Sequence, residues 1–172
     1  FIHAPRPDGI EVLSDALVTV DERGTIGAIS TPADGGHDER LRTARAAGTL
    51  VELPRRTSVL PGFVDLHIHA PQYPQLGKAL DVPLEIWLYR YTFPLEARYA
   101  DLAFAERSYR LLVGDLLAGG TTTALYFATL HQEATLLLAA ICLELGQRGL
   151  VGKVAMDHPD NCPSFYRDAG AE

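Results

Sequence analysis

The chain of 172 residues is long enough for one domain with a hydrophobic core, and its composition is that of a folded protein. Hydrophobic residues make up 47% and charged residues 22%, which excludes an intrinsically disordered chain. A formal net charge of -7 provides no basic surface for nucleic acid or an anionic membrane, so we expect neither as a partner. With two cysteines and no signal-peptide pattern, the sequence favours a cytoplasmic protein.

The first part of the chain predicts a small β element. Two short apolar runs, residues 16–20 and 25–29, flank a turn cluster and indicate a hairpin. Residues 31–48 predict a surface connection or a weak helix, and residues 49–53 predict a strand. Residues 1–4 have a strand pattern with no cap or turn before them, and the last residues begin a helix that nothing closes. We therefore expect the sequence to be a fragment of a longer protein.

From residue 59 onward, strands and helices alternate. The predicted strands cover residues 63–69, 121–128 and 149–156. The predicted helices cover residues 84–91, closed off by Phe93-Pro94, then a segment from Leu102 to the stop at Gly119-Gly120, and residues 133–145. This order predicts an α/β fold whose parallel strands are joined by right-handed crossovers. A doubly wound sheet and a (β/α)8 barrel both begin this way, and a complete barrel needs about 250 residues.

Two histidines on the first of these strands are the strongest chemical signal. Alternate side chains of a strand share a face, so His67 and His69 point the same way, with Asp65 beside them. Two imidazoles at this spacing lie about 6–7 Å apart along the strand, and one metal ion can bridge them. They also lie at the C-terminal end of a parallel strand, where α/β folds place their sites. The opposite face carries apolar side chains that we expect to pack against helices: Val64, Leu66 and Ile68.

Four further polar residues each admit two interpretations. Asp65 could orient one of the histidines or fill the floor of a barrel. Gln72 has an amide that can donate and accept hydrogen bonds toward the edge of a heterocycle, or it is a solvated loop residue. His131 and His158 follow strand ends, and we expect loop positions rather than metal ligation for both.

The sequence LPGFVDLHIH at residues 60–69 resembles the first barrel strand of the amidohydrolase superfamily. More specific stretches narrow the likeness to the guanine deaminase family: APQY at residues 70–73, YTFPLE at 91–96, GTTTA at 120–124, YFAT at 126–129 and GKVAMD at 152–157. The resemblance implies a (β/α)8 TIM barrel, of which residues 59–172 supply about the first three β/α units. It also implies that residues 1–58 are part of a small β-sandwich domain.

The resemblance further implies an activity: zinc-dependent hydrolytic deamination of guanine to xanthine and ammonia. His67 and His69 match the first two ligands of a single Zn2+ ion, and His69 and Gln72 match the ends of a substrate-contacting stretch. The family's other ligands and its catalytic carboxylates come from later strands, so we expect no catalytic residue in this chain. The full-length protein is expected to be a homodimer with guanine as its small-molecule substrate, and the chain alone is expected to be inactive.

Three alternatives stay open at this point. The protein could be another aminohydrolase of the superfamily, acting on a triazine, cytosine or adenosine-like substrate. It could be a non-catalytic relative whose barrel serves as a scaffold. A simple β-rich metal-binding module is the third, and the alternation of strands and helices argues against it.

Overall fold

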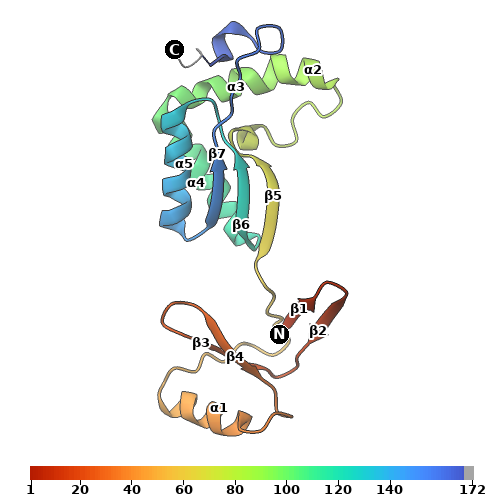
Figure 1. The fold of residues 1–172 in the computed structure, drawn as a ribbon, viewed down its shortest axis with the longest axis vertical. Helices are drawn as coiled ribbons and strands as arrows, with labels where there is room; N and C mark the ends of the chain where they lie inside the picture. Colours follow the sequence, from red (N-terminus) through yellow and green to blue (C-terminus); the bar gives the residue numbers. More distant parts are fainter. Residues whose placement is uncertain (169–172) are drawn as a thin grey trace. The chain divides into compact units, whose positions relative to one another are not determined.

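The computed structural model describes residues 1–168, and the chain divides into two compact units with their boundary between Pro61 and Gly62 (Figure 1). The first unit contains two two-stranded sheets, and the second contains one three-stranded sheet. Within residues 1–168, no helix combines the length and the apolar character that crossing a bilayer requires.

The first unit consists of two antiparallel hairpins and one helix. Its elements are β1 (Ile2–Arg6), β2 (Gly9–Val12), β3 (Leu17–Val20), β4 (Ile26–Ser30) and α1 (His37–Ala46). The hairpin predicted around residues 21–24 is confirmed as β3 and β4. Asp21 fixes its turn, because the side-chain oxygen Oδ1 accepts hydrogen bonds from the backbone N–H groups of Arg23 and Thr25 at 2.9 and 2.8 Å.

Residues 31–53 differ in part from the prediction. Of the two interpretations of residues 31–48, the helix is the one observed, as α1. The strand predicted at residues 49–53 is wrong, since these residues have no strand partner. The backbone N–H of Thr49 instead donates to the carbonyl of Ala44 at 3.0 Å. The start of this segment therefore pairs with the last turn of α1 and not with a strand.

The second unit is built on a three-stranded parallel sheet in the order β5-β6-β7. The strands are β5 (Phe63–His69), β6 (Thr121–Phe127) and β7 (Arg148–Gly152), and the long helices between them are α4 (Leu102–Ala118) and α5 (Gln132–Leu145). The predicted α/β fold with parallel strands is therefore confirmed. β7 ends four residues before the predicted end, because the backbone N–H of Val154 turns to donate to the carbonyl of Thr129.

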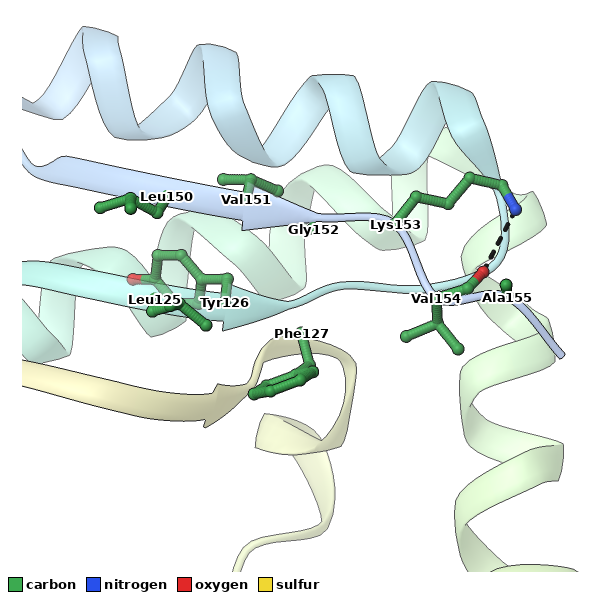
Figure 2. A pocket seen from close by; sticks show the side chains of 9 residues that line it. All are labelled: Leu125, Tyr126, Phe127, Leu150, Val151, Gly152, Lys153, Val154 and Ala155. Atoms are coloured by element: carbon green, nitrogen blue, oxygen red, sulfur yellow. Dashed lines mark hydrogen bonds between the residues drawn. The ribbon is translucent and has the colours of Figure 1, made fainter.

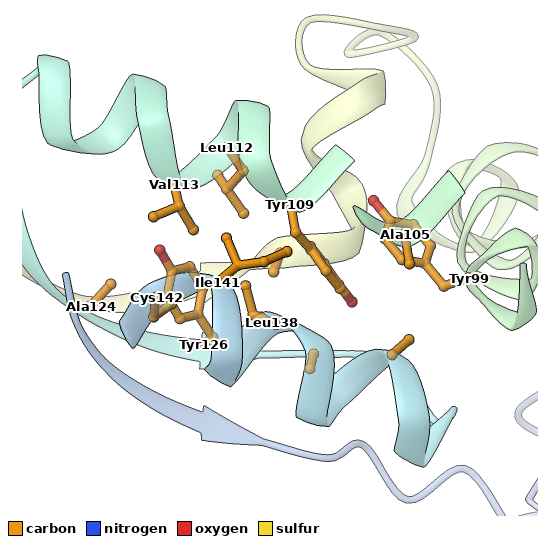
Figure 3. Close-up of a cluster of buried hydrophobic side chains, with 13 residues drawn as sticks. Tyr99, Ala105, Tyr109, Leu112, Val113, Ala124, Tyr126, Leu138, Ile141 and Cys142 are labelled. Atoms are coloured by element: carbon orange, nitrogen blue, oxygen red, sulfur yellow. The ribbon is translucent and has the colours of Figure 1, made fainter. Parts of the chain in front are cut away.

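The core of this unit lies between the two long helices and the central strand (Figure 3). Tyr109 and Leu112 of α4, Leu138 of α5 and Tyr126 of β6 point toward one another there. The Tyr126 hydroxyl donates to Oε1 of buried Gln147 at 2.5 Å, and the amide nitrogen of Gln147 donates to the Thr121 carbonyl at 2.9 Å. The polar end of Tyr126 is thus paired, whereas the hydroxyls of Tyr99 and Tyr109 are buried without a hydrogen-bond partner among the described residues. Both cysteines are also buried: Cys142 in this core and Cys162 in the segment after β7.

The connection between β5 and α4 is more irregular than predicted. Its turns include the short helix η1 (Ala70–Gln75), α2 (Leu84–Trp87), the π-helix η2 (Leu88–Thr92), α3 (Phe93–Ala97) and the short helix η3 (Arg98–Ala100). The predicted stop at Phe93-Pro94 is wrong, because Pro94 lies in the first turn of α3. Proline is tolerated there, since the first N–H groups of a helix have no partner within it.

β5 is exposed on both faces. Val64 and Leu66 are 60% and 65% exposed, so the expectation that they pack against helices is wrong for the described part of the chain. Of the three residues on that face, Ile68 alone packs against the core cluster. The reason is topological: β5 pairs with β6 on one side only, and the long helices pack on β6 and β7.

Candidate functional site

The two histidines of β5 converge at the C-terminal end of the strand. His67 Nε2 and His69 Nε2 lie 3.1 Å apart, with ring centroids separated by 5.1 Å. Phe127, the last residue of β6, lies against both rings at centroid distances of 4.8 and 4.9 Å. Parallel pairing explains this contact, because His69 stands opposite Phe127 in the register. The strand periodicity therefore predicted the shared face, and the neighbouring strand supplies the ring that supports it.

Asp65 acts on the backbone and not on an imidazole ring. Its Oδ1 accepts a hydrogen bond from the backbone N–H of His67 at 3.0 Å. This hydrogen bond is made to the main chain two residues further along the strand, so it does not involve either histidine side chain. Of the two roles considered for Asp65, orientation of a histidine ring is not the one observed.

The two imidazoles suit a metal ion of the zinc type, although they are not a complete ligand set. Burial, and the neighbouring His67, lower the pKa of His69, which favours the neutral ring with a lone pair to donate. Zinc accepts imidazole nitrogen at about 2.0–2.1 Å and takes at least three protein ligands in catalytic sites. Within residues 1–168, no cluster of three or more His, Cys, Asp or Glu side chains is arranged to hold an ion.

Gln72 belongs to a buried polar network that the sequence did not reveal. Its Nε2 donates to Glu96 Oε1 at 2.9 Å, and the hydroxyl of Tyr166 donates to Glu96 Oε2 at 2.6 Å. The Tyr166 hydroxyl also lies 3.3 Å from Thr129 Oγ1. Glu96 is 6% exposed; burial raises the pKa of its carboxyl, and the hydrogen bonds from Tyr166 and Gln72 oppose that rise.

The network joins segments that follow all three strands. Gln72 is in η1 after β5, Thr129 follows β6, and Tyr166 is in the short helix η4 (Ser164–Tyr166) after β7. Glu96, in α3, is the shared acceptor. A solvated loop position for Gln72 is therefore not what the structure has. In the sequence, Glu96 is marked only as the last residue of the YTFPLE stretch that carries part of the family resemblance, and Tyr166 lies 70 residues further along.

The remaining histidines stand apart from the pair. The ring of His131 lies 6.2 Å from that of Tyr166, and burial lowers the pKa of His131. His158 is exposed, and its Nδ1 accepts a hydrogen bond from the backbone N–H of Asp160 at 3.2 Å. Within the part of the chain that the structure describes, neither joins His67 and His69 in a metal-binding group.

A hollow of about 560 Å³ lies along the ends of β6 and β7 (Figure 2). Phe127, which supports the two imidazoles, is also part of its wall. The Lys153 ammonium donates to the Val154 carbonyl at 3.1 Å and to Asp168 at 2.5 Å, so the one charged side chain of the lining is engaged by neighbours. The wall of the hollow is therefore mainly apolar, which is typical of sites that bind small molecules.

Comparison with known proteins identifies the family. Residues 58–170 match the amidohydrolase family. The chain belongs to this family. Human guanine deaminase is 41% identical over 167 residues, which cover 96% of this chain and 36% of the human protein. The guanine deaminase of Dictyostelium discoideum is 38% identical over 177 residues, covering 96% of this chain and 38% of that protein.

A solved structure of the same kind has a similar backbone. The guanine deaminase of C. acetobutylicum, determined with guanine bound in the active site, matches with a TM-score of 0.77 at 30% identity. The match covers 97% of this chain and 37% of that one. The amidohydrolase chain described here thus spans little more than a third of the length of these relatives. The resemblance found in the sequence motifs is confirmed.

Proposed function

We propose that the chain is part of a guanine deaminase, which hydrolyses guanine to xanthine and ammonia. The observation that carries the proposal is the convergence of the His67 and His69 imidazoles, at 3.1 Å, just before Gln72. The similarity of 96% of the chain to guanine deaminases selects this substrate over the other amino-heterocycles considered.

The proposed architecture of the whole protein is a (β/α)8 barrel. Strands β5, β6 and β7 would be its first three, and residues 59–172 its first part. Their parallel order and the TM-score of 0.77 to a guanine deaminase support this assignment. Residues 1–58 would form part of a small β-sandwich domain, an assignment that the two hairpins of the first unit support.

His67 and His69 would hold one Zn2+ ion per chain, together with ligands from elsewhere in the whole protein. Zinc, when bound, makes a water molecule nucleophilic at neutral pH by lowering its pKa toward about 7. The lowered pKa of His69 keeps its imidazole in the form that binds a metal. Phe127 stacks on the ring of His69 and lies tilted against the ring of His67, so it supports both imidazoles from one side.

The substrate would lie beside this pair, with His69 and Gln72 contacting it. Hydrolysis forms a C–O bond at C2 of guanine and breaks the bond from C2 to the exocyclic nitrogen, which leaves as ammonia after gaining a proton. The proton transfers need a carboxylate acid–base group, which we assign to the part of the whole protein that follows these strands. We further infer a homodimer for the whole protein, on the resemblance alone, and a cytoplasmic location, which the low cysteine content favours.

The decisive experiment measures ammonia release from guanine by the gene product that contains this chain, with zinc content determined on the same sample. The double variant His67→Ala/His69→Ala is expected to lose both ammonia release and zinc. The control His3→Ala, which alters a histidine paired with Glu11 in the first unit, is expected to keep both.

Each other outcome rejects a part of the proposal. Zinc binding without ammonia from guanine would make the substrate wrong and direct the assay to triazines, cytosine and adenosine-like compounds. Ammonia release that survives the double variant would make the metal assignment wrong. Absence of both zinc and activity would favour a scaffold.

A further inference from the structure

We propose that Glu96 is a positioning residue for substrate recognition: it holds the Gln72 amide in one orientation, so that the carbonyl oxygen of Gln72 faces the substrate. This inference rests on the proposed function for the identity of the substrate. The contact between Gln72 and Glu96 itself does not depend on that function.

The first argument is the hydrogen-bonding capacity of the two groups. An ionised carboxylate only accepts hydrogen bonds, whereas an amide has a donating end and an accepting end. Glu96 Oε1 lies 2.9 Å from Gln72 Nε2. Rotating the Gln72 amide by half a turn would bring two oxygens together at that distance inside a buried site, so the donating end must face Glu96.

The second argument is that the carboxylate is held in place from its other side. Tyr166 is 1% exposed, and its hydroxyl donates to Glu96 Oε2 at 2.6 Å. The Tyr166 hydroxyl also lies 3.3 Å from Thr129 Oγ1, which can donate to it while the Tyr166 proton is directed at Glu96. The ring of Phe93 packs against Tyr166 at a centroid distance of 5.7 Å. Glu96 is therefore fixed by a buried, fully packed partner.

The consequence concerns which substrates fit. With one amide proton of Gln72 engaged by Glu96, its carbonyl oxygen is the atom left to accept a hydrogen bond. An accepting oxygen selects a heterocycle edge that carries an N–H donor and rejects an edge that presents only lone pairs. A site built to accept such a bond discriminates strongly, because the wrong ligand leaves a buried polar group unpaired.

The chain provides a matched control close by. Gln75, also in η1, donates from Nε2 to Thr92 Oγ1 at 2.8 Å, and both residues are buried. This pair has the same kind of donor in the same short helix, but Glu96 is not its acceptor. Thr92→Val removes the hydrogen bond with little change in shape. It tests whether any damage to this helix changes substrate binding.

The experiment exchanges the two partners in the gene product that contains this chain. Gln72→Glu alone places two carboxylates next to each other, which lowers the Tm. Because their repulsion turns the side chain at position 72 away from its position beside the substrate, we expect the KM for guanine to rise about tenfold or more, as for loss of one hydrogen bond in a buried site. The double exchange Gln72→Glu/Glu96→Gln restores a carboxylate–amide pair with its direction reversed. The amide at position 96 then holds the carboxylate at position 72 in one orientation, with an oxygen free to accept from the substrate.

We expect the double exchange to recover most of the Tm and to bring KM back to within about threefold of the unmodified protein, with kcat changing less than KM. Thr92→Val should lower the Tm and leave KM within about twofold. A double exchange no better in Tm than Gln72→Glu alone would overturn the proposed contact. Recovery of Tm without recovery of KM would overturn the positioning role.

The test separates this inference from the proposed function. If the unmodified protein releases no ammonia from guanine, the proposed function fails. Recovery of Tm in the double exchange, measured without substrate, would still support the Gln72–Glu96 pair. KM would then be measured with the heterocycle that the protein does deaminate, and an unchanged KM across the variants would reject the positioning role.

Discussion

β5 and β6 are parallel neighbours of seven residues each, yet one is exposed and the other is buried. On β6, Ala124 and Tyr126 are completely buried, whereas on β5 most side chains are exposed. β6 has a strand on each side and contributes to the core with α4 and α5, while β5 pairs with β6 alone among the residues that the structure describes.

The difference shows that the strand carrying the candidate ligands is held by backbone pairing rather than by burial of its side chains. Backbone hydrogen bonds to β6 fix its register, Asp65 accepts from the backbone of His67, and Phe127 supports the two imidazoles. Substitutions on β6 should therefore lower the free energy of unfolding. Substitutions of the β5 histidines should change metal binding and leave that free energy nearly unchanged.

The largest effect is expected from Tyr126→Ala on the central strand. It removes a buried ring from the core and leaves Gln147 Oε1 without its hydroxyl donor. We expect the free energy of unfolding to fall by about 3–5 kcal/mol. Urea unfolding of the unmodified and variant proteins measures this loss, and a loss below about 1 kcal/mol would contradict the description of β6 as the centre of the core.

A smaller loss is expected from Gly62→Ala, immediately before β5. A Cβ atom at this position would lie 2.7 Å from the Cβ of Thr122, next to the start of β6. Relief of this overlap has to shift one of the two paired strands, at about 1–3 kcal/mol. Thr122→Gly removes the clashing side chain. The loss in free energy of unfolding caused by Gly62→Ala should therefore be smaller when Thr122→Gly is already present than in the unmodified protein. Urea unfolding of the four proteins in the cycle tests this.

A pH-dependent effect is expected from Glu96, beyond the ends of both strands. Because burial raises its pKa above 4.5, the folded state binds the proton more tightly than the unfolded state. The stability linked to this proton is fully present below about pH 4.5 and is lost as the pH rises through the raised pKa. The free energy of unfolding should therefore fall with rising pH relative to that of Glu96→Gln.

Unfolding of both proteins at a series of pH values between 4 and 7 measures that difference. His131, which lies near Tyr166, is present in both proteins, so its own titration largely cancels. A difference that stays flat, or that grows in favour of the unmodified protein as the pH rises, would mean that Glu96 is not buried as described.

The smallest effect on stability is expected from His67→Ala/His69→Ala. Neither side chain belongs to the core cluster, although the ring of His69 is partly shielded from solvent, so their loss removes no part of the core. In the presence of a metal chelator, the free energy of unfolding should change by no more than about 0.5 kcal/mol. A loss comparable to that of Tyr126→Ala would show that β5 contributes to stability through these side chains after all.

Local patterns predicted the strands and helices that have clear periodicity and clear stops. The alternation in Phe63–His69 predicted that the two histidines share a face, and the double glycine after Ala118 predicted the end of α4. The failures occurred where long-range contacts decide. Residues 49–53 have strand-forming side chains but no partner strand, and Val64 and Leu66 have the right pattern but nothing described that covers them.

Of the candidate site, the sequence indicated three residues and not the network behind them. His67, His69 and Gln72 lie within six residues of sequence, so spacing and family resemblance brought them out. The network of Glu96 and Tyr166 became visible only in three dimensions, since the hydrogen bond from Gln72 to Glu96 spans 24 residues and the one from Tyr166 to Glu96 spans 70. No local periodicity marks a buried carboxylate whose donors come from such distant segments.

The two buried thiols make local unfolding of two parts of the protein measurable without introducing a new residue. Cys142 lies in the core, where burial also raises the pKa of its thiol, and Cys162 donates to the carbonyl of His158 in the segment that carries Tyr166. Alkylating reagents attack the exposed thiolate, so each cysteine reacts only when its own surroundings open. The ratio of the two modification rates would then compare fluctuations of the hydrophobic core with those of the segment that holds Glu96 through Tyr166.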